Sequence, residues 1–250
     1  MKKYLVCTGN EWTKLIHKKK YIVFLFIGVL LSMFNILGRL LVSKLIGSSF
    51  SFGFIASGTS MSMITLFINF LIPLISMMAV CDLFSTEFQD QTIKAVLLRP
   101  ISRFKIYLAK ITAVTLMALL YIAILFASSV LLDAAINKET KGVLYSAGAY
   151  LIDTVPIIIV ILMAAFINQL TKGSTMAMFL CIIIYILLYI VGIFVPSLSG
   201  LLFTGYMKWH TIWLGHILPF GAILSKTALL VGYALIFFSG GYWLFMRHEI

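Results

Sequence analysis

The side chains best suited to chemistry lie in one charged stretch, 85–110, of an otherwise apolar chain. Glu87, Asp90, Gln91 and Lys94 recur at the i, i+3, i+4 and i+7 spacing of one helical face. Asp90 precedes Lys94 by four residues, the favourable order for a helical ion pair. Such a face can meet a charged surface on another protein. We therefore predict a docking helix; the simpler alternative is a connector that lies at the membrane surface.

Turn and cap signals bound this helix. Thr86 and Gln89 have the Thr-x-x-Gln spacing of a capping box, which predicts a helix start. Pro100 disfavours helical geometry at Arg99 and predicts the helix end. Ser102 is a suitable N-cap for a second helix that continues into the next apolar segment. The stretch thus predicts a short amphipathic helix, a proline break and a basic segment.

The composition excludes a soluble globular domain. The chain has 250 residues, of which 62% are hydrophobic and only 11% are charged, with a mean hydropathy of +1.10. These values predict a multi-pass membrane protein in contact with lipid. The net charge of +11 does not indicate a nucleic-acid partner, because the basic residues cluster in short loops between apolar segments. Cys7, Cys81 and Cys181 are too few and too scattered for a disulfide framework or a metal cluster.

Six apolar segments are long enough to cross a bilayer. The predicted spans are 21–38, 62–84, 111–132, 150–170, 175–195 and 227–246. Thirteen of the 19 Lys and Arg residues lie in the N-terminal tail, the 85–110 loop, the turn at Lys172 and the C-terminal tail. The positive-inside rule then places both termini in the cytoplasm.

The segments outside the spans have their own patterns. Residues 1–20 carry six lysines and an intermittent apolar face, which predicts an amphipathic helix on the inner leaflet or, alternatively, a disordered basic tail. That face comprises Leu5, Trp12, Leu15 and Ile16. The outer connection 197–226 predicts one or two short helices anchored by tryptophans. We expect an all-α membrane protein with an interfacial helix over 1–20 and one six-span domain over 21–250.

A few polar residues within or near the spans have defined expectations. Asp82 is expected to pair with a nearby basic residue. Pro73 predicts a kink whose freed carbonyl a neighbour must satisfy. His210 and His216 are six residues apart and do not share a helical face, which argues against a metal pair. The Ser239–Gly241 run suits close helix packing in lipid.

Catalytic motifs are missing from the sequence. It contains no phosphate-binding loop, no His-Glu-x-x-His pattern and no Gly-x-Ser-x-Gly elbow. We therefore expect neither enzymatic activity nor a cofactor bound by this chain.

The charged stretch resembles the permease subunits of type-2 ATP-binding-cassette exporters, which have the type V exporter fold. The resemblance is carried by Glu87, the run 92–98 (TIKAVLL), Arg99-Pro100-Ile101-Ser102-Arg103 and Lys110 before the third span. Gln91 stands where that family usually has glycine. The basic N-terminus, the six-span count and the long fifth connection extend the resemblance over essentially the whole chain.

The resemblance implies a coupling helix after span two that docks on a separate cytosolic ATP-binding subunit, which holds ATP and Mg²⁺. The implied partner-binding residues are Glu87, Asp90, Thr92, Lys94, Arg99, Pro100, Ser102 and Arg103. Arg99 and Arg103 have the alternative role of anchoring to anionic lipid. The 1–20 segment would be an elbow helix, and a second permease subunit, identical or different, would complete the pathway in a bacterial cell membrane.

An apolar pathway favours amphipathic or hydrophobic cargo, such as a peptide, a bacteriocin or a drug. The alternatives are an ion-coupled secondary transporter and a non-enzymatic membrane assembly or immunity protein. A secondary carrier typically has charged or broken helices at mid-membrane, and the sequence lacks acids at mid-span.

Overall fold

The computed structural model of the chain describes residues 2–45, 60–90, 101–137, 143–171, 173–213 and 220–247. Every regular element within these ranges is a helix. The longer elements are α1 (Lys2–Ile16), α2 (Lys19–Leu45), α4 (Ile72–Leu83), α7 (Arg103–Asn137), α8 (Val143–Ile152), α9 (Thr154–Leu170), α10 (Ser174–Phe194) and α13 (Phe220–Arg247). The shorter elements are α3 (Ser60–Leu66), η1 (Phe67–Leu71), α5 (Ser85–Gln89), α11 (Pro196–Ser199), η2 (Phe203–Tyr206) and α12 (His210–Trp213).

Five helical stretches in the described part of the chain are long and apolar enough to cross a membrane. They are Met63–Glu87, Arg103–Leu132, Val143–Leu170, Ser174–Phe194 and Phe220–Arg247. These stretches coincide with the second to sixth predicted spans, which confirms an all-helical, multi-pass membrane protein. The first predicted span, 21–38, falls within the 27-residue helix α2, which is not among the five. The count of six spans stays a prediction.

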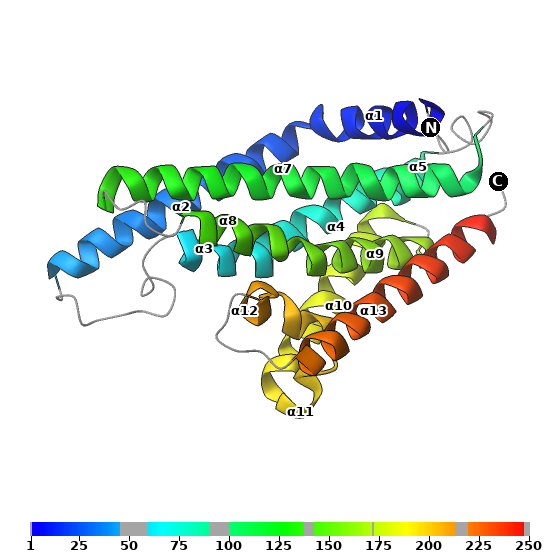
Figure 1. The fold of residues 1–250 in the computed structure, drawn as a ribbon. Helices are drawn as coiled ribbons and strands as arrows, with labels where there is room; N and C mark the ends of the chain where they lie inside the picture. The colour runs from blue at the N-terminus through cyan, green and yellow to red at the C-terminus, as the bar shows by residue number, and fades with distance from the viewer. Residues whose placement is uncertain are drawn as a thin grey trace.

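Helix α7 runs the length of the molecule (Figure 1). Helix α1 packs along one side of α7, α2 crosses α7, and α4 and α9 pack on the side opposite α1. Helix α9 is the centre of the bundle, since it also contacts α10 and α13. Residues of α9 are buried around its whole circumference, as expected for a helix enclosed by others. The outer faces of α10 and α13 remain exposed and apolar.

The small residues of α13 allow it to approach α9 closely. A Cβ atom built on Gly241 would lie 3.4 Å from the Phe166 Cα atom and 2.3 Å from the Tyr107 hydroxyl oxygen. A Cβ on Gly240 would lie 3.0 Å from the Phe166 ring. The predicted packing role of Ser239–Gly241 is thus confirmed for its two glycines.

Pro73 lies just after a π-helical turn, η1, in the second predicted span. The Ile72 N–H donates to the Phe67 carbonyl, five residues back. Because proline has no N–H, it cannot donate to the Asn69 carbonyl. The Tyr185 hydroxyl of α10 donates to that carbonyl instead, at 2.7 Å. The expectation that a neighbour satisfies the freed carbonyl is confirmed.

Several helix boundaries differ from prediction. Helix α13 begins at Phe220 rather than at residue 227. Helix α7 begins at Arg103, directly after the predicted N-cap Ser102, and continues into the third predicted span as expected. The predicted fourth span consists of two helices, α8 and α9, which meet at Asp153. Hydropathy marks the apolar run, whereas the backbone hydrogen bonds that define a helix continue into polar residues.

The connection after α10 contains α11, η2 and α12, so short helices are present as predicted. The role expected for its tryptophans is wrong for Trp209. This side chain is buried and its ring makes an edge contact with Tyr206, 5.8 Å between centroids. Trp213 is half exposed. The connection therefore packs into the bundle.

Candidate functional site

Helix α1 packs on α7 through a face that contains a carboxylate. Cys7, Thr8, Glu11 and Leu15 are all buried, and their spacing lies on one side of the helix. The Tyr4 hydroxyl donates to the Thr112 hydroxyl oxygen at 3.0 Å, close to the start of α7. Helix α1 therefore packs against α7 along one side of the bundle (Figure 1).

The apolar residues expected on one face of this helix point partly toward the bundle and partly outward, and their contact with a membrane stays a prediction. Leu15 is fully buried and Trp12 is half-buried, but Leu5 and Ile16 are exposed. The buried side is the Glu11 side, because α7 offers a positive charge there.

That charge is Lys110 of α7, whose side chain has no solvent exposure. Its Nζ atom lies 3.0 Å from Glu11 Oε2, 2.6 Å from Glu87 Oε2 and 2.9 Å from the Leu83 carbonyl oxygen. An ammonium has three N–H donors, so all three are used. A buried charge is tolerated when it is paired and fully hydrogen-bonded in this way.

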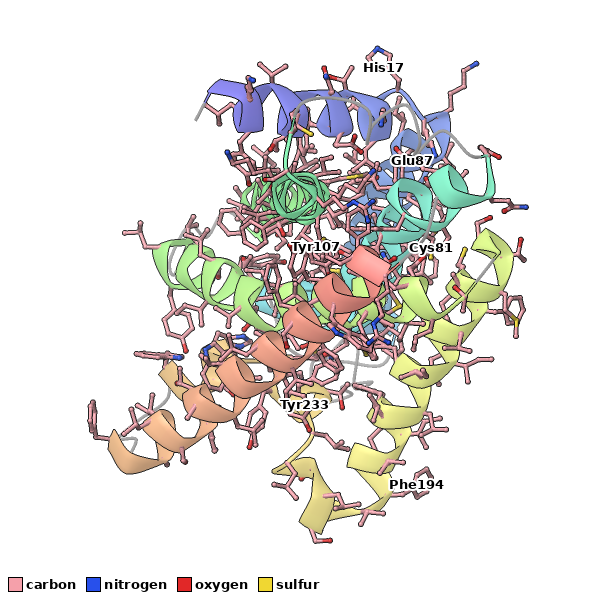
Figure 2. The ribbon with its side chains drawn as sticks, turned by 90° about the vertical axis from the view of Figure 1, so that its right-hand side faces the viewer. His17, Cys81, Glu87, Tyr107, Phe194 and Tyr233 are labelled. Atoms are coloured by element: carbon pink, nitrogen blue, oxygen red, sulfur yellow. The ribbon has the colours of Figure 1, made fainter. Side chains whose placement is uncertain are left out.

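Lys14 of α1 joins the same two carboxylates from the other side. Its Nζ atom lies 2.8 Å from Glu11 Oε1 and 2.7 Å from Glu87 Oε1. Each carboxylate therefore bridges two lysines, and the group is neutral overall. We call Glu11, Lys14, Glu87 and Lys110 the charged junction. It joins α1, α5 and α7, and Glu87 lies between α1 and the bundle in Figure 2.

The surroundings of Glu11 and Lys14 favour the charged form of each side chain. Burial raises the pKa of Glu11, but the nearby Lys110 and Lys14 outweigh burial and hold that pKa below its usual value. Burial likewise lowers the pKa of Lys14, and its bonds to Glu11 and Glu87 raise the pKa above its usual value. Glu11 and Lys14 are therefore both charged at neutral pH.

A second paired acid, Asp82, lies near the end of α4. The Lys20 Nζ atom lies 2.7 Å from its carboxylate, and the Lys18 Nζ atom lies 3.2 Å away. The Tyr21 hydroxyl also donates to it at 2.5 Å. The prediction of a local basic partner for Asp82 is confirmed, and the start of α2 is tied to α4.

The capping box predicted from Thr86 and Gln89 is wrong. Helix α5 follows α4 after a single residue, so it has no free N-terminus for a side chain to cap. The Thr86 hydroxyl donates instead to the Cys81 carbonyl at 3.3 Å. The Gln89 Oε1 atom accepts from the Ser174 N–H and hydroxyl, at 3.3 and 3.1 Å. Gln89 thereby ties α5 to the start of α10.

The predicted docking residues occupy different environments. Glu87 is buried in the charged junction, whereas Asp90 is exposed, so the two do not present one common surface. Ser102 precedes α7 and its carbonyl accepts the Ile106 N–H at 3.2 Å, which is the predicted N-cap position. An Arg103 guanidinium N–H donates to the Met246 carbonyl in the last turn of α13, at 3.0 Å. Thr92, Lys94, Arg99 and Pro100 lie outside the described residues.

Three members of the charged junction were not predicted as site residues: Glu11, Lys14 and Lys110. The sequence contained one signal for Glu11. It is the only acid among the first 80 residues, and it lies four positions before Leu15, so a helix places it on the same face as an apolar side chain. Lys110 lies inside an apolar helix, where a charge needs a buried partner. The sequence does not say which acid that partner is.

At the other end of the bundle, a buried carboxylate holds the α12 turn. Asp153, fully buried, accepts the His210 backbone N–H at 2.6 Å and lies 2.6 Å from its Nδ1 atom. His216 lies outside the described residues. Within the part of the chain that the structure describes, no group of three His, Cys, Asp or Glu side chains is placed to hold a metal.

Residues 9–188 match the family model described as ABC-2 family transporter protein. The match covers most of the chain, from α1 through most of α10, and includes the whole charged junction. No curated protein matches the chain.

Proposed function

The chain belongs to the ABC-2 family of transporter membrane proteins, and we propose that it forms the pathway of an ATP-driven exporter. Permeases of this family lack the ATPase domain and work with an ATP-binding subunit. The chain is accordingly the membrane component of a transporter. The family favours this function over the ion-coupled carrier considered from the sequence.

The proposed contact with the ATP-binding subunit is the segment that follows the second predicted span. It comprises Asp90, Thr92, Lys94, Arg99, Pro100, Ser102 and Arg103. The observation that carries this proposal is the charged junction, in which one lysine of α7 binds acids from α1 and α5 at 3.0 and 2.6 Å. A displacement of α5 would therefore be transmitted directly to α1 and α7.

Glu87 has a different role in this proposal from the one its sequence position suggested. Its carboxylate is occupied by Lys14 and Lys110, so we assign it to transmission within the permease. Asp90 is exposed one turn beyond it and is available to a partner.

The remaining features of the exporter are proposed from the family and the exposed surfaces. A second permease subunit, identical or different, would pair with this one, and the apolar outer faces of α10 and α13 suit either that subunit or lipid. The cargo would be amphipathic or hydrophobic: a peptide, a bacteriocin or a drug. The protein would lie in a bacterial cell membrane with α1 as an elbow helix and both termini in the cytoplasm.

The test is co-purification of the full chain with candidate ATP-binding subunits. We expect Asp90→Arg to release the subunit without lowering the unfolding temperature of the permease. Lys208→Gln, at the far end of the bundle, is the control and should retain it. If no ATP-binding subunit co-purifies with the wild type, or if Asp90→Arg together with Arg99→Glu retains it fully, the docking proposal is wrong.

Glu87→Gln separates docking from transmission. We expect this variant to retain the ATP-binding subunit but to lose transport-dependent stimulation of ATP hydrolysis. Release of the subunit by Glu87→Gln in a folded permease would instead make Glu87 a docking residue.

A further inference from the structure

A cavity of about 430 Å³ lies between α10, the connection after it and the start of α13. Ser174 at one end of α10 binds Gln89 of α5, whereas Gly192 and Ile193 near the other end line the cavity. The two ends are about 27 Å apart at 1.5 Å per residue. In Figure 2, Glu87 and Phe194 lie at opposite ends of the molecule. The volume is within the range of small-ligand sites.

The lining of the cavity is basic. The described residues that line it include Lys208 and Lys226, and none of them is an acid. Neither lysine forms an ion pair with any residue that the structure describes. Lys226 Nζ lies 5.7 Å from the centroid of the Tyr206 ring, which holds it at the edge of the cavity. We call this region the basic cavity.

A buried amide also faces this space. Asn69 lines the cavity and is 4% exposed, yet its side chain has no hydrogen bond to any described residue. Its position follows from the π-helical turn before Pro73, where the Asn69 carbonyl is already satisfied by Tyr185. Buried polar side chains normally have partners, and the Asn69 amide, which lines the cavity, is available to hydrogen-bond a ligand there.

Three hydroxyl groups of the lining already donate to backbone carbonyls. Thr204 donates to the Leu188 carbonyl at 3.2 Å, and Tyr206 donates to the Gly200 carbonyl at 2.6 Å. Thr211 donates to the Lys208 carbonyl at 2.8 Å. The side-chain donors that remain include the Asn69 amide and the two ammonium groups, a set that recognises an anion.

We propose that the basic cavity binds the head of an anionic amphiphile, a phosphate or carboxylate group carried on an apolar tail. The two ammonium groups would neutralise the head, and the Asn69 amide would hydrogen-bond it from the inner wall. Ile193 and Ile212 line the same cavity, and the adjacent surface of α10 exposes Ile190 and Phe194, which suits the tail. The amphiphile is either a membrane lipid or an anionic cargo, and the inference does not rest on coupling to an ATP-binding subunit.

The experiment measures ligand binding to the purified full chain in a neutral detergent by native mass spectrometry. The probes are phosphatidylglycerol, phosphatidylcholine with the same acyl chains, an N-acyl glutamate and inorganic phosphate. We expect saturable binding of phosphatidylglycerol or the N-acyl glutamate. Phosphatidylcholine and inorganic phosphate should bind at least about tenfold more weakly, a difference of one affinity decade.

The variants are Lys208→Gln with Lys226→Gln, and Asn69→Leu. The double lysine variant should weaken binding of the anionic amphiphile by about tenfold or more, while Lys105→Gln, an exposed lysine of α7, should not change it. Binding of phosphatidylglycerol identifies a lipid site, and binding of the N-acyl glutamate alone identifies a site for non-lipid anionic cargo. The proposal would be overturned if phosphatidylcholine or inorganic phosphate bound as tightly as the anionic amphiphiles. It would also be overturned if the double lysine variant bound the anionic amphiphile as tightly as the wild type does.

Asn69→Leu tests the inner wall. In a variant that retains the wild-type unfolding temperature, weaker binding of the anionic amphiphile supports the assigned amide contact. Unchanged binding in that folded variant removes Asn69 from the site and overturns that part of the proposal.

Discussion

The charged junction and the basic cavity both contain two lysines, but these lysines have different partners. In the junction, Lys14 and Lys110 share two carboxylates at 2.6–3.0 Å, and Lys110 is fully buried. In the cavity, Lys208 and Lys226 face an open volume that no acid lines among the residues the structure describes. The junction therefore satisfies its charges internally, whereas the cavity leaves its positive potential available to a ligand.

The difference has a physical basis in desolvation. A lysine removed from water needs fixed acceptors, and the geometry that supplies them also holds the surrounding helices in place. A lysine at the edge of a cavity keeps access to water and needs no fixed partner. The chain has only eight acidic residues against 19 basic ones, so the placement of its acids separates structural lysines from available ones.

Removing Lys110 is the strongest test of this comparison. Lys110→Met would leave the Glu11 and Glu87 carboxylates buried with only the partly exposed Lys14 as a partner. We expect a loss of about 3–5 kcal/mol in the free energy of unfolding, the usual result when one partner of a buried ion pair is removed. Denaturant unfolding of the permease in detergent measures this loss.

The control for Lys110→Met is Lys105→Met, an exposed position on the same helix, where we expect a change within about 0.5 kcal/mol. Adding Glu11→Gln and Glu87→Gln to Lys110→Met should restore part of the stability, because the uncompensated charges are then removed. Equal stability of Lys110→Met and Lys105→Met would show that the junction is not structural.

Gly205 lies in the wall of the basic cavity and tests whether packing, rather than ion pairing, maintains that wall. A Cβ atom on Gly205 would lie 2.4 Å from the Ser199 carbonyl oxygen, and backbone cannot yield as a flexible side chain does. We expect Gly205→Ala to lower the free energy of unfolding by about 1–3 kcal/mol. Gly200→Ala is the matched control, since nothing lies within 4 Å of its Cβ position. Thermal unfolding of the two variants should differ, and identical curves would contradict this account of the wall.

Acid should weaken the junction through Glu11. Because the folded-state pKa of Glu11 lies below its ordinary value of 4.5, its contribution to stability is present above that pH. The contribution is lost as the pH falls through the lowered pKa. Hydrogen exchange of α1 across an acid titration measures the loss of protection, and Glu11→Gln should remove this component. If protection of α1 in the wild type follows that of Glu11→Gln throughout, the ion pair does not hold the helix.

The cavity lysines should have the smallest effect on stability. Lys226→Gln removes a cation–π contact with Tyr206, for which we expect less than about 1 kcal/mol. Lys208→Gln removes an exposed charge that has no ion-pair partner among the described residues, and it should change the free energy of unfolding by no more than about 0.5 kcal/mol. The unfolding assay used for Lys110→Met applies directly. A loss as large as that for Lys110→Met would erase the distinction between the two regions.

Local patterns predicted much of this molecule correctly. The sequence predicted five of the spans and the short helices after α10. It also predicted that a neighbour satisfies the Asn69 carbonyl freed by Pro73 and that Asp82 has basic partners. Each depends on neighbours within a helix or on the need of a buried group for a partner. The capping-box prediction failed because the Thr-x-x-Gln spacing alone does not create a helix start. Helix α5 follows α4 after one residue, so its first turn has no free N–H groups for Thr86 to cap, and the Thr86 hydroxyl binds the Cys81 carbonyl instead.

The sequence by itself determined that this protein is a helical, multi-pass membrane protein of the ABC-2 type, because hydropathy and a local motif carry that information. Only the tertiary structure decided which charges meet. Glu11 and Lys110 are 99 residues apart, and Lys14 and Glu87 are 73 apart. Ion pairs over such separations depend on how α1 and α5 dock on α7, and no local spacing encodes that geometry. The same holds for the basic cavity, whose amide and lysines come from three segments that only the fold brings together.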